Sequence, residues 1–370
     1  MKNILVIFGG VSCEHDISVI TGVLTANCID KTKYCAVPVY IDSDGKWYSG
    51  EALRNIEWYK TADKSKIKSV TLLPWERNIY EIKKGKLKKW KEISCAINCT
   101  HGLNGEDGSL AGLLQLCKIP LASPGMFGSS VCMDKCYTKL ILAGINVSFL
   151  PYVKICKRHY LLKPEIAIKL AEKRLSYPMA VKPANLGSSI GISFARTSEE
   201  LGAALETAFK YDNKAVVEEG LTGFREINCA CYKLKDRYFV SKCEEPVTKN
   251  DILTFKDKYS DKGAEKKFPA DIDKRFSESI KETTRYVYRK LGLSGIIRID
   301  YFLINDKIYI NEINTVPGSL AYYLFTDNLT EFQDILSGLI EDAEERQKNF
   351  ESNIFTYSSD VLSGGVKYKK

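Results

Sequence analysis

The order of apolar and polar residues predicts an α/β lobe in the first third of the chain. Residues 3–8 form an aliphatic run that predicts a strand, and the two glycines after it end that strand. Ser12 stands where an N-cap is expected, ahead of a helix that begins near Glu14. The last strand of this lobe leads into the glycine-rich residues 100–108, and open α/β sheets hold ligands at such strand ends. Further strands are predicted at residues 36–41, 70–73 and 93–98.

The pattern changes after Pro124 and Gly125, where we place a boundary between lobes. Thr197 and Glu200 form a capping signature for a helix whose apolar residues recur at helical spacing. Shorter strands are predicted in this part of the chain, at residues 147–153, 179–181 and 215–218.

The part of the chain after residue 219 combines strands, helices and one polar stretch. Apolar periodicity predicts a strand at 226–234, a helix across 276–291, two strands after it, and a last amphipathic helix around 332–340. Residues 245–270 are polar and lack a strong period. Such a stretch inside a compact domain is uncommon unless it forms a lid, so we predict a lid there.

The composition is that of a soluble globular protein with room for two or three lobes. Of 370 residues, 45% are hydrophobic and 27% are charged. The net charge of +8 is mild for this length, and the one dense lysine cluster, residues 83–91, predicts a solvated β-hairpin. We therefore expect no nucleic-acid partner. No stretch approaches the ~20 apolar residues of a membrane helix, and the apolar run at residues 4–8 is too short for a signal peptide.

The twelve cysteines contain no Cys-x-x-Cys pair. We therefore expect reduced, mostly buried thiols in a cytoplasmic protein, with Cys229 and Cys231 on one face of a strand. The turn at Gly9 and Gly10 lacks the dinucleotide-binding fingerprint, so neither a nicotinamide nor a flavin is expected.

The strongest chemical pattern lies on two consecutive predicted strands. Arg298 and Asp300 lie two apart on the first, and a strand places such residues on one face. Glu312 and Asn314 do the same on the second. A three-residue turn at residues 305–307 would set Asp300 opposite Glu312, and Arg298 would then face Asn314. Two carboxylates and an amide suit Mg²⁺, which takes its other ligands from water and nucleotide phosphates. The alternative, an ordinary exposed hairpin, does not explain why charged residues interrupt otherwise apolar strands.

Two further patterns predict a nucleotide site. Lys182 ends a buried strand, and the small glycine-bearing loop at residues 183–191 offers backbone N–H groups to a polyphosphate. Residues 216–221 end another strand in a turn whose backbone groups are available to an adenine edge. Taken alone, the second pattern is an ordinary strand end.

Six motifs, in this order, resemble the ATP-grasp superfamily and, within it, the D-alanine:D-alanine ligases. The resemblance covers residues 3–345. It implies an α/β protein with the ATP-grasp fold: a Rossmann-like substrate-binding lobe (1–124), a central lobe (125–218), a C-terminal lobe with metal site and lid (219–345), and a tail (346–370). The motifs are Glu14–Ser18, His101–Gly102 with Gly105–Gly108, Met133–Lys135, Lys182–Pro183 with Gly187–Ser189, Lys258–Tyr259, and Arg298–Asp300 with Asn311–Thr315.

The resemblance also implies which residues hold ATP and metal. Asp300, Glu312 and Asn314 would bind two Mg²⁺ ions, with Mn²⁺ as an alternative, and the ions would bridge the phosphates. The implied ATP ligands are Lys135, Lys182 and Ser189 for the phosphates, Glu218 and Leu221 for adenine, and Glu226 for the ribose.

The implied reaction joins two small D-amino acids through an acyl phosphate. Glu14 would hold the ammonium of the first, and Arg298 with the Gly318 N–H would form the oxyanion hole. Glu14, Ser188 and Tyr259 would meet across a closed lid, and Lys258 on that lid would help to exclude water. His101 would either shape its loop or touch the substrate.

Two departures from the family pattern affect this site. Phe224 and Arg225 make the segment before Glu226 one residue longer than is usual. Tyr323, followed by Leu324, stands where the family has a serine that receives the second D-alanine. D-alanine is still the first expectation for the second substrate. D-serine, as in the vancomycin-resistance-type ligases, or another small D-amino acid follows it.

The expected function is therefore synthesis of D-alanyl-D-alanine for peptidoglycan. A nucleotide-binding protein without turnover is the alternative from another class, but such a protein has no need of an oxyanion hole. Small molecules are the expected partners, without nucleic acid or membrane, and a homodimer is implied by the resemblance alone.

Overall fold

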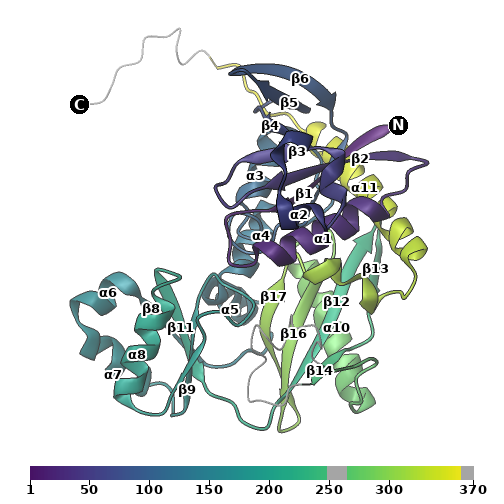
Figure 1. Cartoon of the computed structure of the whole chain (residues 1–370). Coiled ribbons are helices and arrows are strands. Elements are labelled where there is room, and N and C mark those ends of the chain that lie inside the picture. The colour runs from purple at the N-terminus through teal and green to yellow at the C-terminus, as the bar shows by residue number, and fades with distance from the viewer. Residues whose placement is uncertain (248–264, 360–370) are drawn as a thin grey trace.

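The computed structural model describes residues 1–247 and 265–359. These residues form four β-sheets, and the largest lies near the N-terminus (Figure 1). Its strand order is β6-β5-β4-β3-β2-β1-β7. Strand β1, next to the edge strand β7, pairs in parallel with β2 and β7, and its residues 4–8 are fully buried. Burial on both faces explains the uninterrupted apolar run there. The strands are β1 (Lys2–Gly9), β2 (Tyr34–Ile41), β3 (Trp47–Ser49), β4 (Lys68–Leu72), β5 (Asn78–Lys83), β6 (Lys86–Glu92) and β7 (Cys95–Asn98).

Helix α1 (His15–Cys28) follows β1 and packs against it. Ser12 Oγ accepts a hydrogen bond from the Glu14 N–H at 3.1 Å, so it orders the turn ahead of the helix, although Glu14 itself is the N-cap residue. The predicted lysine-rich hairpin is confirmed as β5 and β6. The remaining helical segments of this region are η1 (Glu51–Arg54), α2 (Trp58–Thr61), η2 (Lys64–Lys66) and α3 (Ser109–Leu116).

A second, four-stranded sheet has the order β10-β9-β11-β8 and packs its core against α7 and α8. Thr197 caps α8 as predicted. The strand predicted at residues 147–153 was wrong, because β8 begins only at Tyr152. The Ser148 carbonyl instead accepts a hydrogen bond from the Ile310 N–H at 2.9 Å, at the edge of another sheet. The elements are β8 (Tyr152–Cys156), α6 (Lys157–Leu162), α7 (Pro164–Glu172), β9 (Met179–Pro183), β10 (Ser193–Ala195), α8 (Ser198–Ala208) and β11 (Lys214–Glu219).

The third sheet, β13-β12-β16-β17, has α10 on its core side, and α4 and α5 pack against β17. A two-stranded sheet, β14-β15, adjoins β12. Of the predicted lid at residues 245–270, the segment 248–264 lies outside the described residues. The elements are α4 (Met126–Met133), α5 (Lys135–Gly144), β12 (Arg225–Leu234), β13 (Arg237–Val240), β14 (Glu245–Val247), β15 (Glu265–Lys267), α10 (Lys274–Lys290), β16 (Ile297–Ile304) and β17 (Lys307–Asn314).

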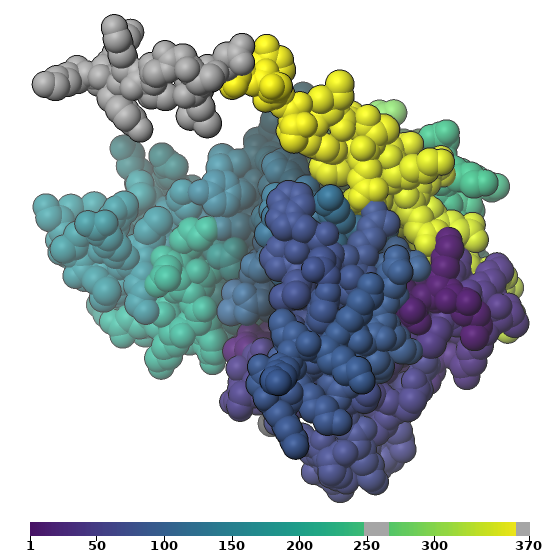
Figure 2. All heavy atoms as spheres, turned by 90° about the horizontal axis from the view of Figure 1, so that it is seen from above, coloured from purple at the N-terminus to yellow at the C-terminus, as the bar shows by residue number. Residues whose placement is uncertain are grey.

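The chain ends by returning to the first sheet. After η3 (Gly318–Leu324), α11 (Leu329–Glu351) runs along the N-terminal lobe, as Figure 2 shows. Phe332 and Leu336 of this helix share one apolar core with Ile4 and Phe8 of β1. This packing ties the segment after β17, which carries part of the site, to the first lobe.

All twelve cysteines are free and most are buried, including Cys229 and Cys231 on β12, as expected. None of the helices in residues 1–247 and 265–359 combines the length and the apolar character that a membrane span needs.

Candidate active site

The hairpin of β16 and β17 brings together the four polar residues that the sequence singles out. Asp300 pairs with Glu312, and Arg298 pairs with Asn314, as predicted. All four lie at the end of the hairpin away from its turn, and all except Asp300 line one cavity.

The three-residue turn predicted for this hairpin was wrong, and a β-bulge explains why the register still holds. Only residues 305–306 lie between the strands, and both have left-handed φ, of 47° and 60°, as a two-residue hairpin turn requires. The pairing shifts by one residue between Asp300 and Tyr301, where Asn311 is the extra residue on β17. Asn311 Oδ1 accepts a hydrogen bond of 3.1 Å from Lys182 Nζ. The bulge thus offers an amide to this lysine.

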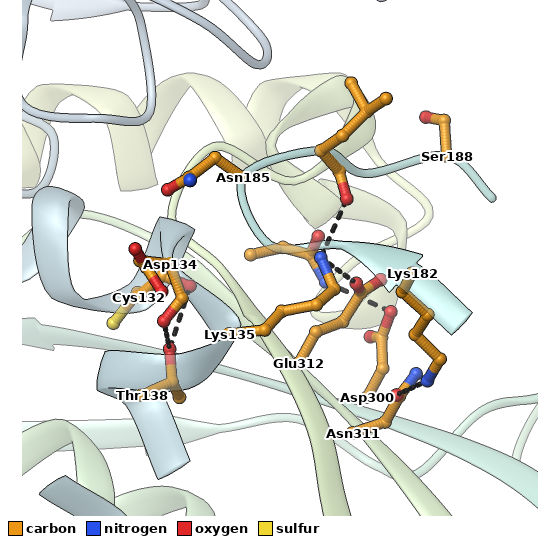
Figure 3. Close-up of polar contacts among 12 residues, drawn as sticks. Cys132, Asp134, Lys135, Thr138, Lys182, Asn185, Ser188, Asp300, Asn311 and Glu312 are labelled. Carbon is orange, nitrogen blue, oxygen red and sulfur yellow. Dashed lines mark hydrogen bonds and ion pairs between the residues drawn. The ribbon is translucent and has the colours of Figure 1, made fainter. Parts of the chain in front are cut away.

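Asp300 is fully buried, and two neighbours hold its carboxylate. Arg298 donates to both oxygens at 2.6 and 2.8 Å, and Asn314 Nδ2 donates at 3.0 Å. Burial alone would lower the pKa of Arg298, but Asp300 outweighs burial and raises it. Glu312 lies 3.5 Å from Lys135 Nζ. Two carboxylates and an amide therefore gather between two cationic side chains, and Figure 3 shows Asp300 and Glu312 beside Lys135.

This donor set fits a hard divalent cation. Carboxylate and amide oxygens are the ligands that Mg²⁺ prefers in proteins. Within the two described ranges of the chain, no three His, Cys, Asp or Glu side chains cluster as a metal site. Asn314 adds an amide beside the two carboxylates, with its Nδ2 facing Asp300.

A cavity bordered by β9, β11, β16 and β17 gathers the residues predicted to bind ATP. Phe194, Phe224 and Phe302 give it apolar walls, as a nucleobase requires. Lys135 Nζ donates to the Leu186 carbonyl at 2.7 Å, at the start of the glycine-bearing loop (Figure 3). All six predicted ATP ligands line this cavity, namely Lys135, Lys182, Ser189, Glu218, Leu221 and Glu226.

Glu218 is buried between two lysines, one of which the sequence reasoning missed. Its carboxylate lies 2.6 Å from Lys182 Nζ and 2.5 Å from Lys139 Nζ. Burial would raise the pKa of Glu218, but the two ammonium groups outweigh burial and lower it to about 2. Lys139 follows Lys135 by four residues on α5, so helical spacing could have placed both on one face.

The loop after β9 meets the start of α1. Ser188 Oγ donates a hydrogen bond to Glu14 Oε1, which joins two residues that were predicted to meet. Ser188 and Ser189 both have left-handed φ, of 53° and 58°. A Cβ on Gly187 would lie 3.1 Å from Glu14 Oε1, so glycine permits this close approach. Lys258 and Tyr259, the other predicted members of this part of the site, lie outside the described residues.

His101 is buried at the end of β7, where it connects three segments. Its Nε2 lies 3.0 Å from Thr21 Oγ1 on α1, and Thr21 Oγ1 accepts from the Ser319 N–H at 3.0 Å. Burial and then Arg298 lower the pKa of His101 to about 3, so the ring is neutral at physiological pH. Glu106 is also buried, and it accepts from the Gly102 and Val316 N–H groups at 3.0 and 2.9 Å.

A second cavity, of about 260 Å³, adjoins the first one and is lined by the predicted substrate residues. The two cavities share Lys135, Gly187, Glu226 and Glu312. Leu324, which was predicted to touch the substrate, does not line it, because its side chain is buried in the core. The predicted residues that line it are Glu14, His101, Ser188, Arg298, Gly318 and Tyr323.

The sequence reasoning missed several polar residues of the second cavity. Lys266 on β15 lies within the polar stretch and Glu244 lies just before it, and no local pattern marks either residue. Asn228 on β12 could have been found, because it alternates with the predicted Glu226 on one face of that strand. The missed residues are Thr21, Glu106, Asn228, Glu244 and Lys266.

Comparisons with known proteins agree with this geometry. The family model described as D-ala D-ala ligase N-terminus matches residues 3–124, and the one described as D-ala D-ala ligase C-terminus matches residues 141–341. A D-alanine–D-alanine ligase of Thermosipho melanesiensis is 39% identical over 94% of this chain and 95% of its own length. That of Thermosipho africanus is 37% identical, with 98% of each chain covered.

Solved structures of D-alanine ligases also superpose on this chain. The D-alanine–D-alanine ligase of Coxiella burnetii superposes with a TM-score of 0.81 and 25% identity, covering 95% of this chain and 96% of its own. The VanG D-Ala:D-Ser ligase of Enterococcus faecalis superposes with a TM-score of 0.77 and 29% identity, covering 92% and 99%.

Proposed function

The chain belongs to the D-alanine–D-alanine ligase family, and from this premise we propose that it joins two D-alanines for peptidoglycan synthesis while ATP is split to ADP and phosphate. Its fold is the ATP-grasp fold of that family. One observation supports the proposal most: the nucleotide cavity, which Lys135 and Lys182 line, and the substrate cavity share Glu312 in their linings. A γ-phosphate and a carboxylate could meet beside this shared residue.

The nucleotide end of the site supplies positive charge. Lys135 and Lys182 would lie along the phosphates, and the Ser189 loop would offer N–H groups to them. Leu221 would present its backbone to adenine, because the Glu218 carboxylate already binds two lysines. Asp300, Glu312 and Asn314 would hold Mg²⁺, which neutralises charge on the phosphates during transfer.

The first amino acid is activated by phosphorylation. Glu14 would hold its ammonium, which leaves the carboxylate to attack the γ-phosphorus. A new C–O–P link forms, the bond between the γ-phosphorus and its bridging oxygen breaks, and ADP leaves. Ser188 would keep Glu14 oriented through their hydrogen bond. Holding both reactants in one geometry lowers the entropic part of the barrier.

The second amino acid attacks the acyl phosphate as a free amine. A C–N bond forms, the carbonyl oxygen takes negative charge, and phosphate then leaves with the bridging oxygen. Arg298 and the Gly318 N–H would stabilise that oxyanion, and each donor of this kind contributes on the order of 10²–10³ in rate. The proton lost from the amine would leave through the region of Glu14, Ser188 and Tyr259.

D-serine as the second substrate is the alternative that a specific observation favours. Tyr323 lines the substrate cavity where the family pattern has a serine, and the VanG D-Ala:D-Ser ligase is among the similar structures. A cytoplasmic location fits the need for ATP. The homodimer stays an expectation from the family resemblance, and so do the lobe boundaries at residues 124 and 218.

The proposal is tested by supplying ATP, Mg²⁺, D-alanine and a panel of second D-amino acids, and measuring ADP and dipeptide. We expect D-alanyl-D-alanine with one ADP per peptide bond. A mixed D-alanyl-D-serine product in excess would favour the alternative. ATP binding without any dipeptide would refute the ligase assignment.

A Glu312→Gln variant tests the metal assignment in the same assay. We expect kcat to fall on the order of 10²–10³-fold, because one anionic ligand is lost, while the melting temperature stays near that of the wild type. Glu345→Gln, at an exposed position on α11, is the matched control and should leave both quantities unchanged. Undiminished turnover in Glu312→Gln would contradict the assignment.

A further inference from the structure

Helices α6 and α7 cover the second sheet on the side away from the nucleotide cavity (Figure 1). Alternation along β9 separates the two sides of this sheet. Met179 and Val181 pack in the core that faces the helices, whereas Ala180 and Lys182 line the nucleotide cavity. The outer surface of α6 and α7 therefore has no part in the site described above, and a partner bound to it would not cover that site.

Four aliphatic side chains of these helices are exposed to solvent. Ile166 and Leu170 are four residues apart on α7 and share its outer face, while Ala167 and Ala171 fill the core face. One residue, Lys163, separates the end of α6 from the start of α7. Single exposed leucines are ordinary, but four aliphatic residues within positions 161–170 indicate an interaction surface. The exposed fractions are 68% for Leu161, 72% for Leu162, 54% for Ile166 and 40% for Leu170.

The same helices carry an excess of positive charge. Residues 157–174 contain six basic and two acidic residues, so this short segment holds half of the net charge of +8. Lys157 Nζ donates to the Phe209 carbonyl at 2.7 Å, and Glu172 accepts from the Tyr177 hydroxyl at 2.9 Å. The other five cations are exposed, and none of them forms a salt bridge within the described ranges of the chain: Arg158, Lys163, Lys169, Lys173 and Arg174.

Helical spacing mixes these cations with the aliphatic residues. Lys169 follows Ile166 by three residues and Lys173 follows Leu170 by three, so both lysines lie on the outer face of α7. A lysine side chain covers apolar surface with its methylene groups while its ammonium reaches further out. Such a face matches a layer that has an apolar interior and an anionic surface, as a lipid bilayer with anionic headgroups does.

Composition and shape favour this lipid layer over a protein partner. Protein interfaces are enriched in aromatic residues and arginine and depleted in lysine. Residues 161–174 contain no aromatic residue, and three of the five exposed cations are lysines. Figure 1 shows α6 and α7 at the outer end of this part of the molecule, and a protruding surface meets a flat layer without a complementary groove.

We propose that the outer surface of α6 and α7 docks reversibly on an anionic lipid bilayer. Leu161, Leu162, Ile166 and Leu170 enter the headgroup layer, and the five exposed cations lie against the lipid phosphates. Docking of this kind is peripheral and needs no membrane-spanning helix. It goes beyond the proposed ligase function and does not rest on it. Because the surface lies behind the second sheet, the docked molecule keeps its nucleotide cavity open to solution.

The test is co-sedimentation of the full chain with vesicles of phosphatidylglycerol and phosphatidylcholine in equal parts, compared with vesicles of phosphatidylcholine alone. We expect binding to the mixed vesicles that is more than about 100-fold tighter and that weakens with salt. Lys169→Gln combined with Lys173→Gln should weaken it about 25-fold, since each cation near an anionic surface contributes about fivefold. Leu162→Gln combined with Ile166→Gln should weaken it about tenfold or more through lost apolar burial.

A matched control separates this surface from net charge alone. Lys86→Gln combined with Lys88→Gln removes the same charge from exposed positions of β6, and it should keep wild-type binding. Equal weakening by this control would overturn the proposal, and so would a wild type that stays in the supernatant with the mixed vesicles.

A second ligand distinguishes lipid from an acidic protein. Polyglutamate offers anionic charge without an apolar layer, so we expect it to bind far more weakly than the mixed vesicles. Binding of polyglutamate that is as tight as vesicle binding, and that Leu162→Gln with Ile166→Gln leaves unchanged, would assign the surface to an acidic protein and overturn the lipid proposal. The rate of dipeptide formation should be the same with and without vesicles, and inhibition by the mixed vesicles would contradict docking through a surface behind the sheet.

Discussion

Replacing Lys139 by methionine removes one of the two cations that hold the buried Glu218 carboxylate. Burial raises the pKa of Glu218, but the two lysines outweigh burial and lower it from its ordinary value of 4.5 to about 2, which at neutral pH corresponds to a net stabilisation of roughly 3 kcal/mol. Burial also lowers the pKa of Lys139, so keeping its ammonium charged inside the protein costs free energy. The Lys139→Met variant no longer carries this desolvation cost, which offsets part of the lost attraction to Glu218. We therefore expect Lys139→Met to lower the free energy of unfolding by only about 1–2 kcal/mol.

Chemical denaturation at pH 7 measures this change, and a second variant sharpens it. Glu218→Gln leaves Lys139 and Lys182 buried without a counter-charge, so its cost should reach about 3–5 kcal/mol. The double variant Lys139→Met with Glu218→Gln should cost less than Glu218→Gln alone. A depressed carboxyl pKa stabilises above pH 4.5, so the difference between wild type and Lys139→Met should shrink as the pH falls toward 2. If the decrease in unfolding free energy of the double variant equals the sum of the decreases of the two single variants, this account of Glu218 and its two lysines is wrong.

The remaining predictions concern buried groups of the substrate cavity. Because the folded pKa of His101 is about 3 against an ordinary 6.5, the unfolded chain binds more protons below pH 6.5, and this residue should cost roughly 2 kcal/mol of stability at pH 5. His101→Gln should remove that part of the acid sensitivity in denaturation curves at pH 7 and pH 5, and an unchanged pH dependence would contradict a neutral buried ring. Arg298→Lys keeps the positive charge but loses the bidentate hydrogen bonds to Asp300. We therefore expect kcat to fall on the order of 10²–10³-fold in the dipeptide assay. Wild-type kcat in that variant would exclude Arg298 from the oxyanion hole.

Sequence reasoning worked where a pattern is local and periodic. Arg298, Asp300, Glu312 and Asn314 could be placed on one patch because strand alternation fixes which residues share a face. The bulge at Asn311 could not be predicted, because nothing in an alternating strand marks the residue that will lack a partner. The predicted pairing of Asp300 with Glu312 was right because two differences cancel. The predicted turn has three residues where the structure has two, and the bulge at Asn311 adds one residue to β17.

The errors and omissions arose where distant segments decide the structure. Ser148 and Phe149 carry strand-forming neighbours, but their backbone pairs with the edge of β17 instead of extending β8. Glu244 and Lys266 are ordinary charged residues in the sequence. They become a pair only because β14 and β15 adjoin β12 beside the cavity. Lys139 is different, since its spacing from Lys135 was visible along one helix face.

Transfer of a carboxylate oxygen tests the central claim most directly. The enzyme is supplied with ATP, Mg²⁺ and D-alanine labelled with ¹⁸O in both carboxylate oxygens, and the released phosphate and dipeptide are analysed by mass spectrometry. If the first D-alanine is activated as an acyl phosphate, each peptide bond formed delivers one ¹⁸O atom to the phosphate and leaves one in the new amide carbonyl. Dipeptide formed with unlabelled phosphate would contradict the account.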